Sequence, residues 1–185
     1  MGAEPVVTKA GKYQGNTLFQ DEQNIGLAFM QSLPTDLQSE ATISKEKMGN
    51  NNQTEAFRDN QIIDYEGLSM TKLDSSQQEQ LLNLVALYVN NMREGHAEVK
   101  LAEVRAHLAN TWFSWVGDTK ENSVFYYRIH SPVLLIEFDH QVPVGVPSDV
   151  HEPSRNHIHT VVRTPNGNDY GKDLLRQHLE EHHGH

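Results

Sequence analysis

The sequence predicts one α+β domain in which an antiparallel β-meander of about four strands is covered on one face by helices. Three observations support this class. Apolar residues recur at helical spacing between Leu18 and Ala109, and from Trp112 onwards they alternate with polar residues at a spacing of two. Helices that precede a run of strands pack together on one face of the sheet. A length of 185 residues suits one core and leaves little margin for a second.

The first two helices are expected close together near the start of the chain. The first spans about residues 18–33. A short second helix follows at once, because Thr35 and Gln38 have the spacing of a capping box, in which each side chain bonds to the backbone of the other residue. Residues 45–60 then form an Asn/Gln-rich run with no apolar partner to bury, so we expect a mobile surface loop.

Three more helices follow from the pattern. The most regular one has Ser75 or Ser76 as its N-cap and is expected to end at Gly95. The next spans about residues 97–109, directly before the strands. The last spans about residues 170–181, after the final strand.

Residues 1–185 are expected to form a single domain. Its ends, residues 1–17 and 183–185, are expected to be flexible because they show neither helical nor strand periodicity. No apolar run approaches the ~18 residues that a membrane span requires, and the N-terminus has no apolar signal core. The chain is therefore expected to be soluble, without a membrane partner or an export signal of its own.

Charge and composition exclude several functions. The net charge is −10 and no stripe of Lys and Arg is present, which excludes a nucleic-acid partner, since binding a phosphate backbone requires clustered cations. The absence of cysteine excludes disulfides, thiolate nucleophiles and Cys-type zinc sites. Eleven histidines make the chain histidine-rich and supply potential metal ligands.

The four strands have a regular apolar/polar alternation. They are expected at residues 112–115, 124–130, 133–140 and 156–163. Glu137 and Asp139 share one side of the third strand, and His157, His159 and Arg163 share one side of the fourth. A register shifted by one residue would turn the apolar residues of one strand away from those of the other, so the two polar sides must coincide.

One sheet face should therefore gather the polar groups of three strands, and the helices should cover the opposite, apolar face. The polar set is Arg128, His130, Glu137, Asp139, His157, His159 and Arg163. Val133, Leu135 and Val161 lie among these residues, which favours half-buried polar groups with a function.

The set suggests a metal site. Residues i and i+2 of a strand lie about 6.6 Å apart, so His157 and His159 with Glu137 can serve as three ligands and leave one position open, as in catalytic sites. Such donors suit a divalent transition metal, namely zinc, iron, manganese or copper. Asp139 would act as general base or partner of a ligand, and Arg128 and Arg163 would hold an anionic group or developing negative charge of a small-molecule substrate.

Three other interpretations stay open. In a metal-free binding module, Arg128, Arg163 and Tyr127 would hold an anionic or sugar ligand. In a purely structural domain, the polar face would simply be solvated, and its acid–histidine pairs would contribute a few tenths of a kcal/mol. A Pro-bearing connection over residues 141–155 could act as a lid that brings His151 over the site, and His178 of the last helix could join it.

A family resemblance rests on four segments: Phe125-Tyr126-Tyr127-Arg128-Ile129, Ser131 to Asp139, Asn156-His157-Ile158-His159, and Asp169 to Leu175 with His178. With these the chain resembles the domain-of-unknown-function family 3500, over about residues 75–180 and less closely before them. The resemblance implies no established activity. Family members extend further upstream and often carry an export signal, which implies that this chain is the C-terminal part of a longer, exported protein. The chain departs from the family pattern at His140, where asparagine is typical, and in the long loop after it.

Overall fold

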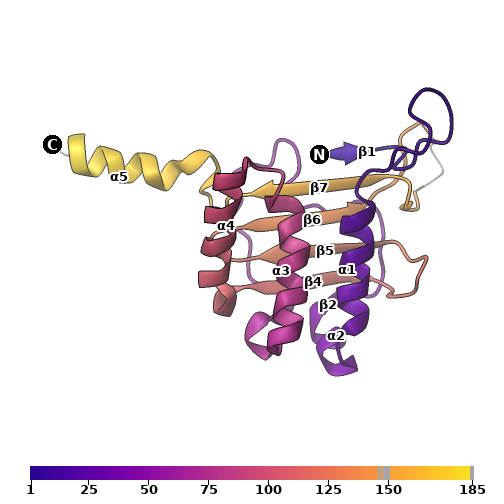
Figure 1. The fold of residues 1–185 in the computed structure, drawn as a ribbon, viewed down its shortest axis with the longest axis horizontal. Helices are drawn as coiled ribbons and strands as arrows, with labels where there is room; N and C mark the ends of the chain where they lie inside the picture. The colour runs from indigo at the N-terminus through magenta and orange to yellow at the C-terminus, as the bar shows by residue number, and fades with distance from the viewer. Residues whose placement is uncertain (146, 148–150, 184–185) are drawn as a thin grey trace.

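A computed structural model describes residues 1–145, 147 and 151–183 of the chain. It shows an α+β fold, as the sequence predicts, built around a seven-stranded sheet (Figure 1). The strands are β1 (Gly2–Ala3), β2 (Thr42–Ser44), β3 (Leu68–Ser69), β4 (Trp112–Gly117), β5 (Phe125–His130), β6 (Leu135–His140) and β7 (Ile158–Arg163).

The four strands expected from the sequence are β4 to β7, and each pairs antiparallel with the next. The sheet is larger than the expected meander and is mixed rather than antiparallel. Its order is β1-β7-β6-β5-β4-β2, with β3 also beside β4, and β2 runs parallel to β4. The three added strands have only two or three residues each, too few for a period-two pattern to be recognised.

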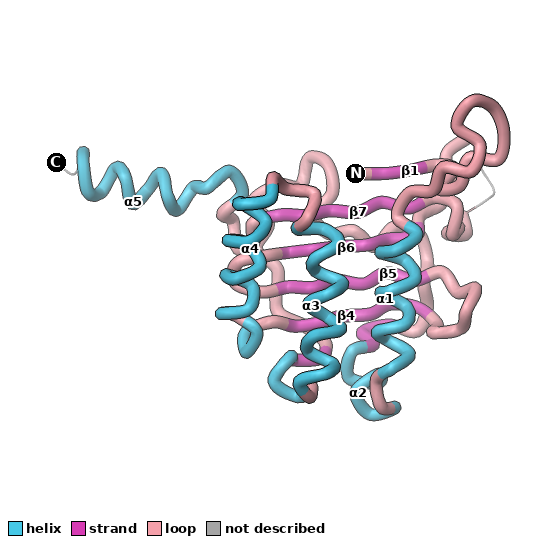
Figure 2. Tube along the Cα trace, viewed as in Figure 1, coloured by secondary structure: helices cyan, strands magenta, loops and turns pink. Residues whose placement is uncertain are grey.

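Helices cover one face of the sheet. They are α1 (Gln20–Ser32), α2 (Thr35–Ala41), α3 (Ser75–Val89), α4 (Glu94–Ala106) and α5 (Lys172–His183), with short 3₁₀ helices at Met70–Lys72, Leu108–Asn110 and Asp169–Gly171. In Figure 2, α1, α3 and α4 lie across the strands on the same side, whereas α5 extends away from the sheet. None of the described helices is long and apolar enough to cross a membrane.

The start and end of α3 differ from the expectation. Its N-cap is Asp74 rather than a serine, and Asp74 forms the capping box with Gln77. A carboxylate is favoured here because its charge interacts well with the positive end of the helix. The helix ends at Val89, and Gly95 lies inside α4, so this glycine is not a helix stop.

The capping box expected for α2 is absent. Pro34 occupies the N-cap position, and its fixed φ prepares the helix one residue earlier than a Thr35 cap would. Gln38 donates instead to the carbonyl of Leu33, at 2.8 Å.

The apolar core lies between the helices and the sheet. Aromatic rings of β4, β5 and β6 line its floor, with Tyr127 and Phe138 stacked at a centroid distance of 5.0 Å. The Tyr127 hydroxyl lies 2.6 Å from that of Tyr88 on α3 and donates to the carbonyl of Glu22 on α1. These contacts satisfy the polar end of a fully buried tyrosine and tie two helices to the sheet.

His140 ties α1 to the sheet in a similar way. It is fully buried at the end of β6; its Nδ1 accepts from the backbone N–H of Phe125, and its Nε2 lies 2.9 Å from the side-chain oxygen of Gln23. Burial, and then the charge of Arg155, lower the pKa of His140 to about 3. The imidazole is therefore neutral in the folded chain at neutral pH.

We predict that His140 makes folding sensitive to acid. The unfolded imidazole has a pKa of about 6.5, so the unfolded chain binds a proton that the folded chain excludes between about pH 6.5 and the folded pKa of about 3. The free energy of unfolding should fall across this window, by on the order of 3–5 kcal/mol from this residue. Urea titrations from pH 7 to 4 should show a smaller fall for His140→Gln. The exposed control His96→Gln should behave as the parent chain, and equal pH slopes for all three proteins would contradict the prediction.

Candidate functional site

The polar face exists in the register that the sequence predicts. Arg128 of β5 lies opposite Glu137 of β6, and Asp139 lies opposite His159 of β7. Directly opposed residues point to the same side of a sheet. The helices lie on the other side, against Ile136, so the two faces are assigned as expected.

The polar face is buried rather than solvated. Arg128, Glu137 and Asp139 are each 0% exposed, and His130 is 2% exposed. The cover is the segment of residues 45–67 between β2 and β3, and residues 45–60 of it were expected to be a mobile surface loop. We call this segment the covering loop. Its Asn/Gln-rich part finds partners in the sheet, and a solvated face is excluded for β5 and β6.

Glu137 anchors the covering loop. Its two oxygens accept the backbone N–H groups of Gln53 and Thr54, at 2.8 and 2.9 Å, and the hydroxyls of Thr54 and Tyr126. Four donors satisfy one buried carboxylate, which is the condition for burying such a group at acceptable cost. Among the described residues, no hydrogen bond or ion pair joins Glu137 to His157 or His159.

Asp139 anchors the same loop two residues further along β6. Its Oδ2 accepts the backbone N–H groups of Asn51 and Asn52 and the side-chain amide of Gln141, and its Oδ1 lies 3.1 Å from the Nζ of Lys47. Burial raises the pKa of Asp139, and the Lys47 charge opposes that shift. Burial lowers the pKa of Lys47 in turn, opposed by Asp139. The carboxylate of Asp139 therefore holds the covering loop, and its role as a general base stays a prediction.

Arg163 also binds the covering loop. Its Nε and Nη2 donate to the carbonyls of Thr54 and Glu55, at 3.1 and 3.2 Å, and its Nη1 lies 3.8 Å from Asp169. Its donors are thus engaged by backbone. Tyr127, the other predicted ligand-binding residue, lies on the helix-covered face because residues 125, 127 and 129 alternate with 126, 128 and 130, so it does not join this site.

Arg128 and His130 lie further along the polar face on β5. The Nη2 of Arg128 donates to Glu66 of the covering loop at 2.6 Å. The ring of His130 lies 4.3 Å from that of Tyr65, which stacks in turn on Trp112. Burial, followed by the Arg128 charge, lowers the pKa of His130 to about 4, so its imidazole is neutral.

His157, directly before β7, and His159 of β7 lie together at the opposite end of the face. The Nε2 atoms of His157 and His159 are 3.1 Å apart. The Nδ1 of His157 lies 2.7 Å from the carbonyl of Val142, and burial, then the charge of His157, lower the pKa of His159. This is the one pair of predicted metal ligands that the structure shows in direct contact.

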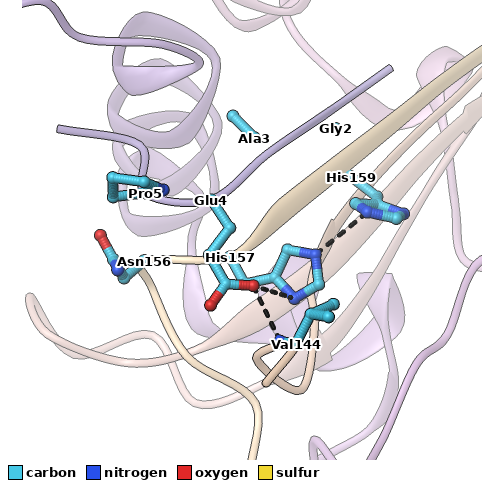
Figure 3. A pocket seen from close by; sticks show the side chains of 8 residues that line it. All are labelled: Gly2, Ala3, Glu4, Pro5, Val144, Asn156, His157 and His159. Carbon is cyan, nitrogen blue, oxygen red and sulfur yellow. Dashed lines mark hydrogen bonds and ion pairs between the residues drawn. The ribbon is translucent and has the colours of Figure 1, made fainter. Parts of the chain in front are cut away.

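A surface hollow of about 490 Å³ adjoins this pair. Gly2, Ala3, Glu4, Pro5, Val144, Asn156, His157 and His159 line it (Figure 3). Glu4 is the carboxylate nearest to the histidines: its Oε2 lies 3.4 Å from the Nδ1 of His157 and accepts the N–H of Val144. Figure 3 shows Glu4 on the Nδ1 side of His157, with His159 on the Nε2 side.

The described residues contain no group of three or more His, Asp or Glu side chains placed to hold a metal ion. His151 is exposed in the loop after β6, and residues 146 and 148–150 of that loop lie outside the described part, so a lid there is not described. His178 lies on α5, with its ring 4.9 Å from that of His182.

Sequence reasoning missed Glu4, Lys47 and Glu66, the charged partners of the polar face. Gly2 pairs with His159 through β1, which places Glu4 beside residues about 150 positions later in the chain. No local pattern signals a pairing this distant. Alternation also places Tyr126 on the polar face, where its hydroxyl donates to Glu137, but the predicted polar set did not include it.

Comparison with known proteins adds a family and no function. A model of the family described as "Protein of unknown function (DUF3500)" matches residues 1–172, which includes the N-terminal region where the resemblance was less close. No curated protein and no solved structure matches the chain.

We predict that Glu137→Gln loosens the covering loop. Glutamine keeps the shape but presents an NH₂ group to backbone donors, which leaves buried N–H groups without an acceptor, and the cost should be about 2–4 kcal/mol of unfolding free energy. Hydrogen exchange at the amides of Gln53 and Thr54 should become faster. The exposed Glu98→Gln serves as the control. Unchanged exchange in Glu137→Gln would show that the carboxylate does not hold the loop.

Proposed function

The chain belongs to the DUF3500 family, whose description assigns no activity, and from the geometry we propose that it is a divalent transition-metal-binding domain with His157 and His159 as ligands. The observation that carries the proposal is the 3.1 Å separation of the two Nε2 atoms beside an open hollow. The proposed metals are the same four expected from the sequence: zinc, iron, manganese and copper.

The separation fits a shared ion. Two nitrogen ligands at about 2.0–2.1 Å from one ion, at angles between about 90° and 110°, lie about 2.9–3.4 Å apart. The 3.1 Å observed lies within this range. In the metal-free chain the same approach is a hydrogen bond between the two rings, in which one Nε2 donates to the other, so a bound ion would take the place of the shared proton.

The surroundings of His157 support the assignment. The carbonyl of Val142 can only accept, so Nδ1 of His157 carries the proton and Nε2 presents its lone pair. A ring held in this way through its second nitrogen is typical of metal-ligating histidines. Glu4 lies on the same Nδ1 side and is proposed to orient the ring rather than to bind the ion.

The hollow leaves room for further ligands. Two protein ligands leave several coordination positions for water or for a small-molecule substrate, which suits a metal-dependent enzyme. A bound ion there would act as a Lewis acid or activate water. The walls of the hollow, Gly2 to Pro5 with Val144 and Asn156, would then determine which molecules fit.

The third ligand proposed from the sequence has to be reconsidered. Glu137 would bind a metal only after losing four hydrogen bonds to the covering loop and Tyr126. The proposed ligand set is therefore the histidine pair. The alternative, a metal-free module for an anionic or sugar ligand, keeps only Arg128 of its three proposed side chains. Arg163 donates to backbone carbonyls, and the hydroxyl of Tyr127 bonds to that of Tyr88.

We predict that the chain binds about one divalent transition metal ion through this pair. The background protein should carry His178→Ala, His182→Ala and His183→Ala, which removes the histidines of α5. Adding His157→Ala or His159→Ala should abolish uptake of zinc in calorimetry and of any metal in elemental analysis. His96→Ala, an exposed histidine on α4, is the matched control. Retention of the metal by both the His157→Ala and the His159→Ala variant would contradict the proposal.

We also predict that Glu4→Gln weakens zinc binding about tenfold, because an oriented histidine ligand loses the carboxylate that favours its Nδ1 proton. The loss should be partial, unlike that of His157→Ala. Glu98→Gln, which changes an exposed carboxylate on α4, is the control. Complete loss of binding in Glu4→Gln would identify Glu4 as a ligand instead, and no loss would remove it from the site.

A further inference from the structure

A group of buried polar atoms without partners lies on β5, away from the histidine pair. The Nε and Nη1 of Arg128 and the Nδ1 of His130 are buried and have no hydrogen-bond partner within the described part of the chain. Buried polar atoms are normally satisfied, so unpaired ones indicate a missing partner. Both residues lie on the polar face, two positions apart, which places their Cα atoms about 6–7 Å from each other.

The unpaired atoms of the two residues have different hydrogen-bonding roles, and these roles indicate the chemical groups that a ligand needs. Arg128 is a permanent cation whose Nε and Nη1 are free, and once Glu66 releases the Nη2 either of them can hold a carboxylate together with Nη2 by two hydrogen bonds. Burial, followed by the Arg128 charge, lowers the pKa of His130 to about 4 and keeps it neutral, and its buried Nδ1 has no partner within the described residues. A molecule that satisfies both residues needs a carboxylate and, close to it, a hydroxyl that can donate.

The carboxylate of Glu66 already occupies part of the place where a ligand carboxylate would bind Arg128. The Oε2 of Glu66 accepts from the Nη2 of Arg128 alone, a single bond where the guanidinium can give two. The Arg128 side chain is 0% exposed and that of Glu66 is 49% exposed. Glu66 therefore stands between the buried guanidinium and solvent.

The Glu66 side chain can move while its backbone stays in place. Its backbone carbonyl accepts from the hydroxyl of Ser114 at 2.6 Å, and Gly67 follows with φ +87, where a Cβ would meet the carbonyl oxygen of Phe113 at 2.3 Å. The backbone is thus fixed while the side chain is free to rotate outward. On the outer side lies a hollow of about 400 Å³, large enough for a small molecule. Gln53, Arg58, Gln61, Ile62, Ile63, Asp64 and Glu66 line it.

We propose that Arg128 and His130 form a binding site for a small hydroxy acid, which enters from this hollow and displaces the tethered carboxylate of Glu66. The ligand carboxylate takes two N–H groups of Arg128, and its hydroxyl donates to the Nδ1 of His130. One carboxylate replaces another, so the charge facing Arg128 is unchanged by the exchange. The proposal does not depend on metal binding by His157 and His159.

Calorimetry on the full chain tests this site with lactate as the probe. Glu66 competes as a tethered carboxylate at millimolar effective concentration, so its removal in Glu66→Ala should tighten lactate binding about tenfold or more. Glu79→Ala is the matched control, because Glu79 also pairs with an arginine, Arg105, but on the helical surface, and its affinity for lactate should equal that of the parent chain. The comparison leaves the buried arginine in place.

Two further probes separate the parts of the ligand. Lactamide, which lacks the charge, should not bind to Glu66→Ala. Acetate, which lacks the hydroxyl, should bind more weakly than lactate, and His130→Phe in the same background should reduce lactate to the affinity of acetate. The proposal is overturned if Glu66→Ala, in which no tethered carboxylate competes, binds no lactate at about 100 mM. Equal lactate affinity in the parent and Glu66→Ala, or equal affinity for lactate and lactamide, would overturn it as well.

Discussion

The structure depends on two buried carboxylates of β6 that hold a loop by its backbone. Glu137 and Asp139 each accept two successive N–H groups from residues 51–54. Without that loop, the polar face of β5 and β6 would lie in water. With it, the sheet has a cover on both faces, helices on one and irregular chain on the other. An irregular segment can cover a sheet only where its backbone polar groups find partners, and these two side chains supply them.

This arrangement separates polar groups that are fully engaged from those that are not. A buried carboxylate with four donors is held by interactions worth about 1.5–3 kcal/mol each, so neither a metal nor a substrate displaces it readily. Arg163 is engaged in the same way. At one end of the face the Nε and Nη1 of Arg128 have no partner within the described residues, and at the other end the Nε2 atoms of the histidine pair bond to each other rather than to the covering loop. Both proposals concern those ends for this reason.

The sequence predicted the parts of the fold that side-chain periodicity controls. The parity of β6 against β7, and the assignment of Glu137 and His159 to one face, follow from alternation, because a shift of one residue would bury the wrong side. The covering loop was not predictable in this way. Its contacts are made by backbone N–H groups, which every residue except proline possesses, so an Asn/Gln-rich segment gives no pattern that distinguishes it from mobile chain. Glu4 was missed because strand pairing across the whole chain brings it to His157.

The same distinction explains why alternation could place these residue types on one face but could not show which of them are free to bind a ligand. Alternation shows that carboxylates and imidazoles share a face, but not how many of their hydrogen-bonding positions are already used. Glu137 and Glu66 illustrate this: both are acidic, both contact the polar face, and only Glu66 reaches solvent and makes a single bond to its partner. The number of donors around each carboxylate, rather than its presence on the face, decides whether it is a fixed part of the fold or a group that a ligand can replace.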